Sequence, residues 1–383
     1  MCVFKKNMKR KTIFWKDLGV TAQFSIFGEN QSMEMHVIFH VESRSELFSG
    51  QYARIQDAYS LFLSDYSAFK PIFKRYFLSD ATNQAPLIQK ETNCGISIIQ
   101  QPPLDGSKLA IWCYLATDVK TKGDSCKVSV EHGSYIDYYN GSMFNPSGDS
   151  YHQTKKILED YESQLAENEM CMTSNCLRTW FFIRDVDTQY AGMVKARREN
   201  FVEQGLTEKT HYIASTGIGG NPAHPSALVQ MDAFAVKGLK PNQFNHLYAS
   251  THLNPTYEYG VTFERGTVLK YGDRSHVLIS GTASIDNKGN VLYVGNVEKQ
   301  CHRLWENVEM LLKEGGATYD DVTQMIVYLR DIADYEMIRE LYKKRFPDHP
   351  VVFTLAPVCR PTWLIEMECQ AIIEKGNPNF DNF

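Results

Sequence analysis

Residues 275–286 read SHVLISGTASID, residues 297–316 read VEKQCHRLWENVEMLLKEGG, and residues 323–336 read TQMIVYLRDIADYE. The first and last stretches contain short apolar runs rich in β-forming residues, which predicts strands, and the last run ends at Asp331. Apolar side chains recur at helical spacing in the middle stretch, which predicts an amphipathic helix. Another apolar run, PTWLIEMECQAI at 361–372, predicts a closing strand.

The same order of features occurs twice more along the chain. Amphipathic helices are predicted over residues 49–66 and 151–170, and the strands that follow them end at Asp80 and Asp185. A second helix is predicted after the aspartate in the later two copies, whereas the first copy has only the short segment ATNQAPLIQK. Repetition of this kind indicates tandem copies of one structural unit.

The predicted unit is ββαβαβ, an α+β sheet with helices on one face, and it occurs at residues 12–120, 124–240 and 266–375. Residues 241–265 fit none of the copies, so we expect a connecting loop there. A sheet with helices on one face must still bury the other face. We therefore expect an intramolecular pseudo-trimer with sites in the clefts between units, and a monomer in solution.

Composition restricts the classes of protein that fit. Of the 383 residues, 43% are hydrophobic and 22% are charged, as in globular proteins. The net charge is −5 and no basic block occurs, which argues against a nucleic-acid partner. No apolar run of membrane-spanning length and no signal-peptide pattern occurs, so we expect a cytoplasmic protein without a membrane partner.

Cysteine and histidine spacing gives no sign of structural bridges or metal binding. The nine cysteines include no CxxC pair, and the eleven histidines form no HExxH motif. We therefore expect no disulfide framework, no metal and no cofactor.

The third copy resembles the Rid/YjgF family in LISGTASID, APVCR and LIEMECQAI. The resemblance implies a chorismate-mutase-like fold and a cleft site, where an arginine holds a substrate carboxylate and a glutamate on the last strand orients water for enamine or imine hydrolysis. Only the third copy has that glutamate, Glu366, because the second has Gln230 and the first has Ala110 at the same place. Arg360 lies closer to the glutamate than the family pattern has it, which argues against ordinary Rid deaminase activity.

Over residues 98–370 the chain is similar to chorismatases, which are single chains of three Rid-like units, whereas residues 1–95 match less well. The similar segments are QQPPLDGSKLAIW, LRTWFFIRDVD, KARRENF, STGIGG, YGVTFER, LISGTASI and VCRPTWLIEME. The resemblance implies a cofactor-independent enzyme that cleaves the enolpyruvyl ether of chorismate, a small anionic metabolite, to pyruvate and a dihydroxycyclohexadiene or hydroxybenzoate acid. A Rid-type enamine or imine deaminase and a non-catalytic metabolite-binding protein are the alternatives.

Ether cleavage of this kind begins with protonation of a carbon atom, so it needs an acid that is neutral at the working pH. Glu366 is the candidate, because the preceding residues Trp363 and Leu364 could desolvate its carboxyl group. The competing interpretation places Glu366 and Glu368 in solvent on a sheet edge.

The two carboxylates of such a substrate would be bound by arginines, whose planar guanidinium groups form paired hydrogen bonds. Arg265 and Arg360 are the first candidates and Arg178 is the third. The other candidate binding residues are Tyr259 as a donor, Gly281 and Ala283 as small residues beside the ring, Thr282 as a hydroxyl partner, and Cys359 in a shaping role.

Overall fold

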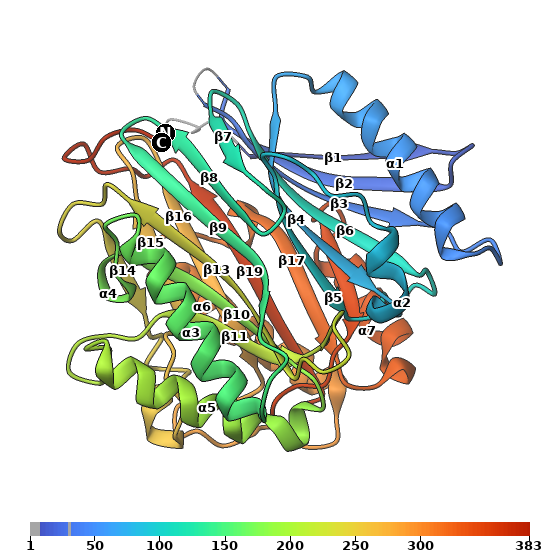
Figure 1. Ribbon diagram of the computed structural model, residues 1–383. Coiled ribbons are helices and arrows are strands. Elements are labelled where there is room, and N and C mark those ends of the chain that lie inside the picture. Colours follow the sequence, from blue (N-terminus) through green and yellow to red (C-terminus); the bar gives the residue numbers. More distant parts are fainter. Residues whose placement is uncertain (1–7, 30–31) are drawn as a thin grey trace, which may run out of the picture.

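The computed structural model describes residues 8–29 and 32–383. It confirms the three tandem α+β units, each built around its own mixed sheet (Figure 1). In each unit three strands precede the first α-helix, and two strands or, in the second unit, three follow the last α-helix, so the units carry more strands than the predicted ββαβαβ pattern. Within the described ranges, no helix is both long enough and apolar enough to cross a membrane.

The first unit has the strand order β1-β2-β3-β6-β4-β5, to which a short strand of the second unit, β12, adds at the edge. Its elements are β1 (Met8–Trp15), β2 (Val20–Phe27), β3 (Glu34–Val41), α1 (Phe48–Asp65), β4 (Lys70–Leu78), α2 (Ala81–Gln84), the 3₁₀ helix η1 (Ala85–Leu87), β5 (Gly95–Gln100) and β6 (Leu109–Ala116). The helix after Asp80 spans one turn only, as the sequence indicated.

The second unit has the strand order β11-β10-β13-β9-β8-β7. Its elements are β7 (Lys120–Gly123), β8 (Lys127–His132), β9 (Tyr135–Phe144), α3 (Ser150–Ala166), α4 (Met172–Asn175), β10 (Cys176–Ile183), α5 (Val186–Glu203), β11 (Ala214–Gly219), β12 (Asn221–Pro222) and β13 (Val229–Lys237). The Asp149 side chain accepts a hydrogen bond from the backbone N–H of His152, which satisfies a free donor at the start of α3.

The third unit has the strand order β14-β15-β16-β19-β17-β18. Its elements are β14 (Phe244–Leu247), η2 (Thr256–Tyr259), β15 (Gly266–Lys270), β16 (Ser275–Ala283), α6 (Val297–Glu314), η3 (Tyr319–Asp321), β17 (Val322–Leu329), η4 (Ile332–Asp334), α7 (Tyr335–Arg345), β18 (Val351–Leu355) and β19 (Ile365–Ile373). Part of the segment 241–265, expected to be a connecting loop, is therefore sheet, because β14 pairs with β15.

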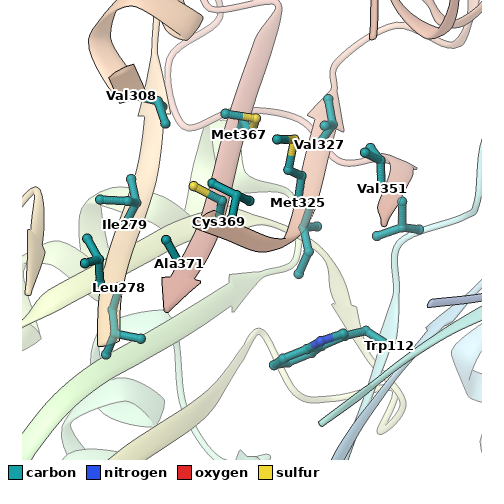
Figure 2. Packing of buried hydrophobic residues seen from close by; sticks show 14 of the residues in the cluster. Trp112, Leu278, Ile279, Val308, Met325, Val327, Val351, Met367, Cys369 and Ala371 are labelled. Atoms are coloured by element: carbon teal, nitrogen blue, oxygen red, sulfur yellow. The ribbon is translucent and has the colours of Figure 1, made fainter. Parts of the chain in front are cut away.

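Each sheet contacts the other two: β5 lies against β9, β11 against β16, and β17 against β2 and β3. Side-chain alternation along β19 separates two environments. Met367, Cys369 and Ala371 pack in the apolar cluster that includes Val308 of α6 (Figure 2). The even-numbered residues between them, among them Glu368, consequently point to the opposite face, where the three sheets meet.

A buried ionic network connects all three units at that junction. Arg75 of the first unit pairs with Asp232 of the second at 2.8 Å, and both side chains are fully buried. The guanidinium of Arg75 also lies 3.6 Å from Glu368 of the third unit. Arg178 completes the network with a 2.9 Å ion pair to Glu368. Because buried charges are costly unless paired, this network favours one relative arrangement of the units.

We expect Arg75→Ala to lower the free energy of unfolding by about 3–5 kcal/mol, because it leaves Asp232 buried without its ionic partner. Denaturant titration of the purified protein measures the effect. Lys156→Ala is the matched control, since Lys156 and Asp160 form an exposed pair, and it should change stability by less than about 1 kcal/mol. Equal effects of the two substitutions would show that the network adds nothing to unit docking.

Candidate functional site

A cavity lies at the seam between the second and third units. Elements α5 and β11 form one wall, and β16, β19 and the segment before β19 form the other. Six residues proposed from the sequence line it: Arg265, Gly281, Ala283, Cys359, Arg360 and Glu366. Eight further residues line it that were given no binding role from the sequence: Tyr190, Arg197, Ser215, Gly217, Val261, Phe263, Ile285 and Trp363.

Glu366 is 5% exposed and lies on β19, an interior strand between β16 and β17. This position excludes the solvated sheet edge considered for it. Gly281 lies directly beside it, since a Cβ atom at that position would stand 2.1 Å from Glu366 Oε1. The glycine thus provides the space that the carboxyl group occupies.

The surroundings of Glu366 favour its protonated form. Burial, and after it the negative charge of Glu368, raise the pKa of this carboxyl group from 4.5 to about 8, against the opposing effect of Arg178 and Arg265. Glu368 has different surroundings, because it accepts hydrogen bonds from Trp180 and Thr216 in addition to its ion pairs. At neutral pH Glu366 is therefore a neutral acid beside an anchored carboxylate.

Three guanidinium groups surround the cavity, which makes it suited to an anion. Arg265 is 4% exposed and donates to the backbone oxygen of Asn254 at 2.9 Å. Arg360 stacks on the ring of Trp363 at 4.8 Å, and Arg197 donates to Ser215 Oγ at 3.5 Å. These contacts orient the arginine side chains in advance of binding.

Cys359 borders the cavity as a neutral thiol. Burial, together with the nearby Glu366 carboxyl group, raises the pKa of this thiol to about 12. A thiol in this state is a poor nucleophile. The shaping role assigned to Cys359 from the sequence fits this environment.

Two of the proposed binding residues do not line the cavity. Arg178 is engaged instead by Glu368 and Thr216 in the ionic network, because its position on β10 directs it to the junction of the sheets. Thr282 is buried and donates to Ser280, since alternation along β16 places Gly281 and Ala283 on the cavity side instead. The side chain of Tyr259 lies outside the described part of the chain.

Arg197 was the main omission, although it belongs to the quoted segment KARRENF. Its neighbour Arg198 is exposed, whereas Arg197 is 1% exposed and reaches the cavity. The rotation of α5 about its axis, relative to the sheet, decides which of these two arginines faces the cavity. The local sequence indicates that rotation only weakly. Across the described ranges, no three His, Cys, Asp or Glu side chains gather in a way that could hold a metal ion.

The raised pKa of Glu366 makes stability depend on pH. Because its folded-state pKa of about 8 exceeds the ordinary 4.5, the stabilisation from the bound proton is complete below pH 4.5 and is lost as the pH rises to 8. Glu366→Gln has no such proton. We expect the free energy of unfolding of the wild type, measured relative to Glu366→Gln, to fall between pH 5 and pH 8.

Denaturant titrations at the two pH values check this expectation, with the exposed Glu374→Gln as the matched control. The control should keep a constant difference from the wild type. A constant difference for Glu366→Gln as well would mean that this carboxyl group ionises normally in the folded protein.

Comparisons with known proteins agree with this architecture. Residues 269–373 match the family model described as Endoribonuclease L-PSP. The chain is 34% identical over 108 residues to RutC family protein SSO3206 of Saccharolobus solfataricus, covering 28% of this chain and 84% of that protein. It is 31% identical over 100 residues to RutC family protein PYRAB12510 of Pyrococcus abyssi, covering 26% of this chain and 79% of that protein.

A solved structure extends the likeness to most of the chain. A crystal structure of a chorismatase superposes with a TM-score of 0.62 and 16% identity, covering 79% of this chain and 92% of that one. At this identity the likeness concerns the fold. The chain therefore belongs to the RutC family of the Rid/YjgF superfamily, and its three units are arranged as in a chorismatase fold.

Proposed function

We propose that this protein cleaves the enolpyruvyl ether of chorismate to pyruvate and a dihydroxycyclohexadiene or hydroxybenzoate acid, with Glu366 as the proton donor. The observation that carries the proposal is a buried carboxyl group, neutral at physiological pH, that lines the same cavity as three arginines. An acid of this kind is what an enol ether requires, because its carbon must be protonated before water can attack.

The reaction proceeds in three steps. Glu366 transfers its proton to the terminal methylene carbon, which leaves an oxocarbenium ion and a carboxylate. Water attacks the cationic carbon and returns a proton to that carboxylate, which forms a hemiketal. Collapse of the hemiketal releases pyruvate and the ring alcohol, the dihydroxycyclohexadiene acid, and the leaving oxygen takes up the hydroxyl proton. A hydroxybenzoate product requires the additional loss of one water molecule from that acid. The carboxylate of Glu366 also stabilises the cation while it exists.

Charge complementarity supports the choice of a dianionic substrate. The arginines 197, 265 and 360 place positive charge around the cavity, and a protonated Glu366 adds no negative charge to oppose the substrate. A carboxylate ordinarily ionised at this position would repel it. Ala283 and the aromatic Phe263 and Trp363 form apolar surface against which a six-membered ring can pack.

We expect Glu366→Gln to abolish pyruvate release from chorismate, because the amide has the shape of the neutral acid but no proton to give. A coupled pyruvate assay measures this loss, and circular dichroism checks that the fold is retained. Glu374→Gln, on the exposed end that follows β19, should keep full activity. Full turnover by Glu366→Gln would remove this residue from the chemistry, and turnover of an imine without any pyruvate release would favour the deaminase alternative.

We also expect Arg265→Ala and Arg360→Ala each to raise KM for chorismate about tenfold or more, since a charge-assisted hydrogen bond contributes about 1.5–3 kcal/mol. Steady-state kinetics give KM and kcat separately. Arg44→Ala is the control, because Arg44 is exposed and lies in the first unit. Unchanged KM in both cavity variants would place the substrate elsewhere.

A further inference from the structure

A second cavity lies at another seam, where α7 and β18 of the third unit face β2 and β3 of the first. The cavity has a volume of about 370 Å³. Residues that line it include Thr21 and His40 from the first unit, and Lys343, Val351 and Phe353 from the third. Nothing in the proposed ether cleavage uses this seam.

The pairing of strands shows that this cavity occupies the same place in the repeat as the first one. On β10 and β11, Thr179 pairs with Ser215 and Phe181 pairs with Gly217. The two β11 residues, Ser215 and Gly217, line the first cavity. The parallel pair β17 and β18 repeats this arrangement. There Met325 pairs with Val351, as Figure 2 shows, and Val327 pairs with Phe353. Val351 and Phe353 both line the second cavity.

The charged residues follow the same correspondence. Arg197 and Lys343 stand the same number of residues after Asp185 and Asp331, the aspartates that follow β10 and β17. Each of the two cations lines its own seam. The second seam has thus kept a cation at the position where the first has one.

The opposite wall differs in one decisive way. Ala283 pairs with Glu366 across β16 and β19, and His40 pairs with Ala110 across β3 and β6. In the first unit the position of Glu366 is therefore taken by Ala110, which is fully buried and does not line the second cavity, and no Asp or Glu among the described residues lines that cavity. The second cavity can hold a ligand of similar chemistry, but it lacks the acid for ether cleavage.

The neighbouring charges leave Lys343 as the group available to an anion. Arg339 pairs with Glu336 and Glu340 on its own helix. The remaining groups are imidazoles: His40 lies 3.6 Å from Asp105, and burial lowers the pKa of His349 to about 4, so that it is neutral. Lys343 makes no ion pair with any residue in the described ranges.

Aromatic rings form the rest of the second cavity. Phe353 stands where the first seam has a glycine, and the rings of Tyr335, Tyr342 and Phe346 complete an apolar wall. Tyr335 and Tyr342 both pack against Phe353, with ring centroids 5.7 and 5.2 Å apart. Such a wall favours a flat ring, and the cation beside it favours an anionic group.

We propose that the seam between the third and first units binds a small carboxylate with a flat apolar ring and does not convert it. The carboxylate is held by the Lys343 ammonium, and the ring packs on Phe353 and its neighbours. This site is independent of the reaction assigned to the first seam, so either assignment can fail without the other.

Methyl NMR on the full chain, labelled at alanine and valine methyl groups, tests this proposal with benzoate as the probe. The Val351 methyls report on the second seam and the Ala283 methyl reports on the first. We expect saturable shifts at Val351, with acetate and benzyl alcohol binding at least tenfold more weakly because each lacks one of the two recognised features.

Lys343→Glu should weaken the benzoate response at Val351 about tenfold or more and leave the response at Ala283 unchanged. Lys344→Glu is the matched control, because it alters the overall charge equally but does not line the cavity. Thr21→Trp, which fills the cavity from the first unit, should abolish the response. Absent shifts at Val351, or equal responses in the Lys343 and Lys344 variants, would overturn the proposal.

Discussion

The arrangement of the molecule depends on charges that are buried where the three sheets meet. Arg75, Asp232 and Glu368 come from different units, and the side chains of all three are buried. Each charge is compensated only when the other units are docked in the correct register, since removal of a partner leaves an ion in a medium of low dielectric constant. Apolar contact alone tolerates sliding of one sheet over another, whereas ion pairs and their hydrogen bonds do not.

The same network affects the candidate site through a single strand. Glu368 is fixed by Arg178, Trp180 and Thr216, and it stands two positions after Glu366 on the same face of β19. Its charge adds to burial in keeping the Glu366 carboxyl group neutral. One carboxylate serves the docking of units and also influences the acidity of its neighbour, so the structural and chemical roles of β19 are physically coupled.

Repetition has produced three seams with different outcomes. The seam with Glu366 contains a cavity lined by arginines. The seam where His40, the strand partner of Ala110, lines the wall has an open cavity with no Asp or Glu among its described lining residues. The first and second units pack closely against each other. Ser142 Oγ accepts a hydrogen bond from the backbone N–H of Ile98, and Gly141 lies too close to the first unit to leave room for a side chain. Divergence of a few side chains on one scaffold thus separates the seams chemically.

The sequence alone determined the tandem repeat, the α+β units and the strand that carries Glu366, because these follow from local spacing of apolar residues and from turn-forming aspartates. Contacts between distant segments decided the rest. The pairing of β14 with β15 placed part of an expected loop in a sheet. The phase of α5 and the register of β10 brought Arg197 to the cavity and took Arg178 to the ionic network. The acidity of Glu366 also depends on tertiary structure, since its pKa is set by burial and by the charge of Glu368. Glu368 is itself held in place by Arg178, which is 190 positions away in the sequence.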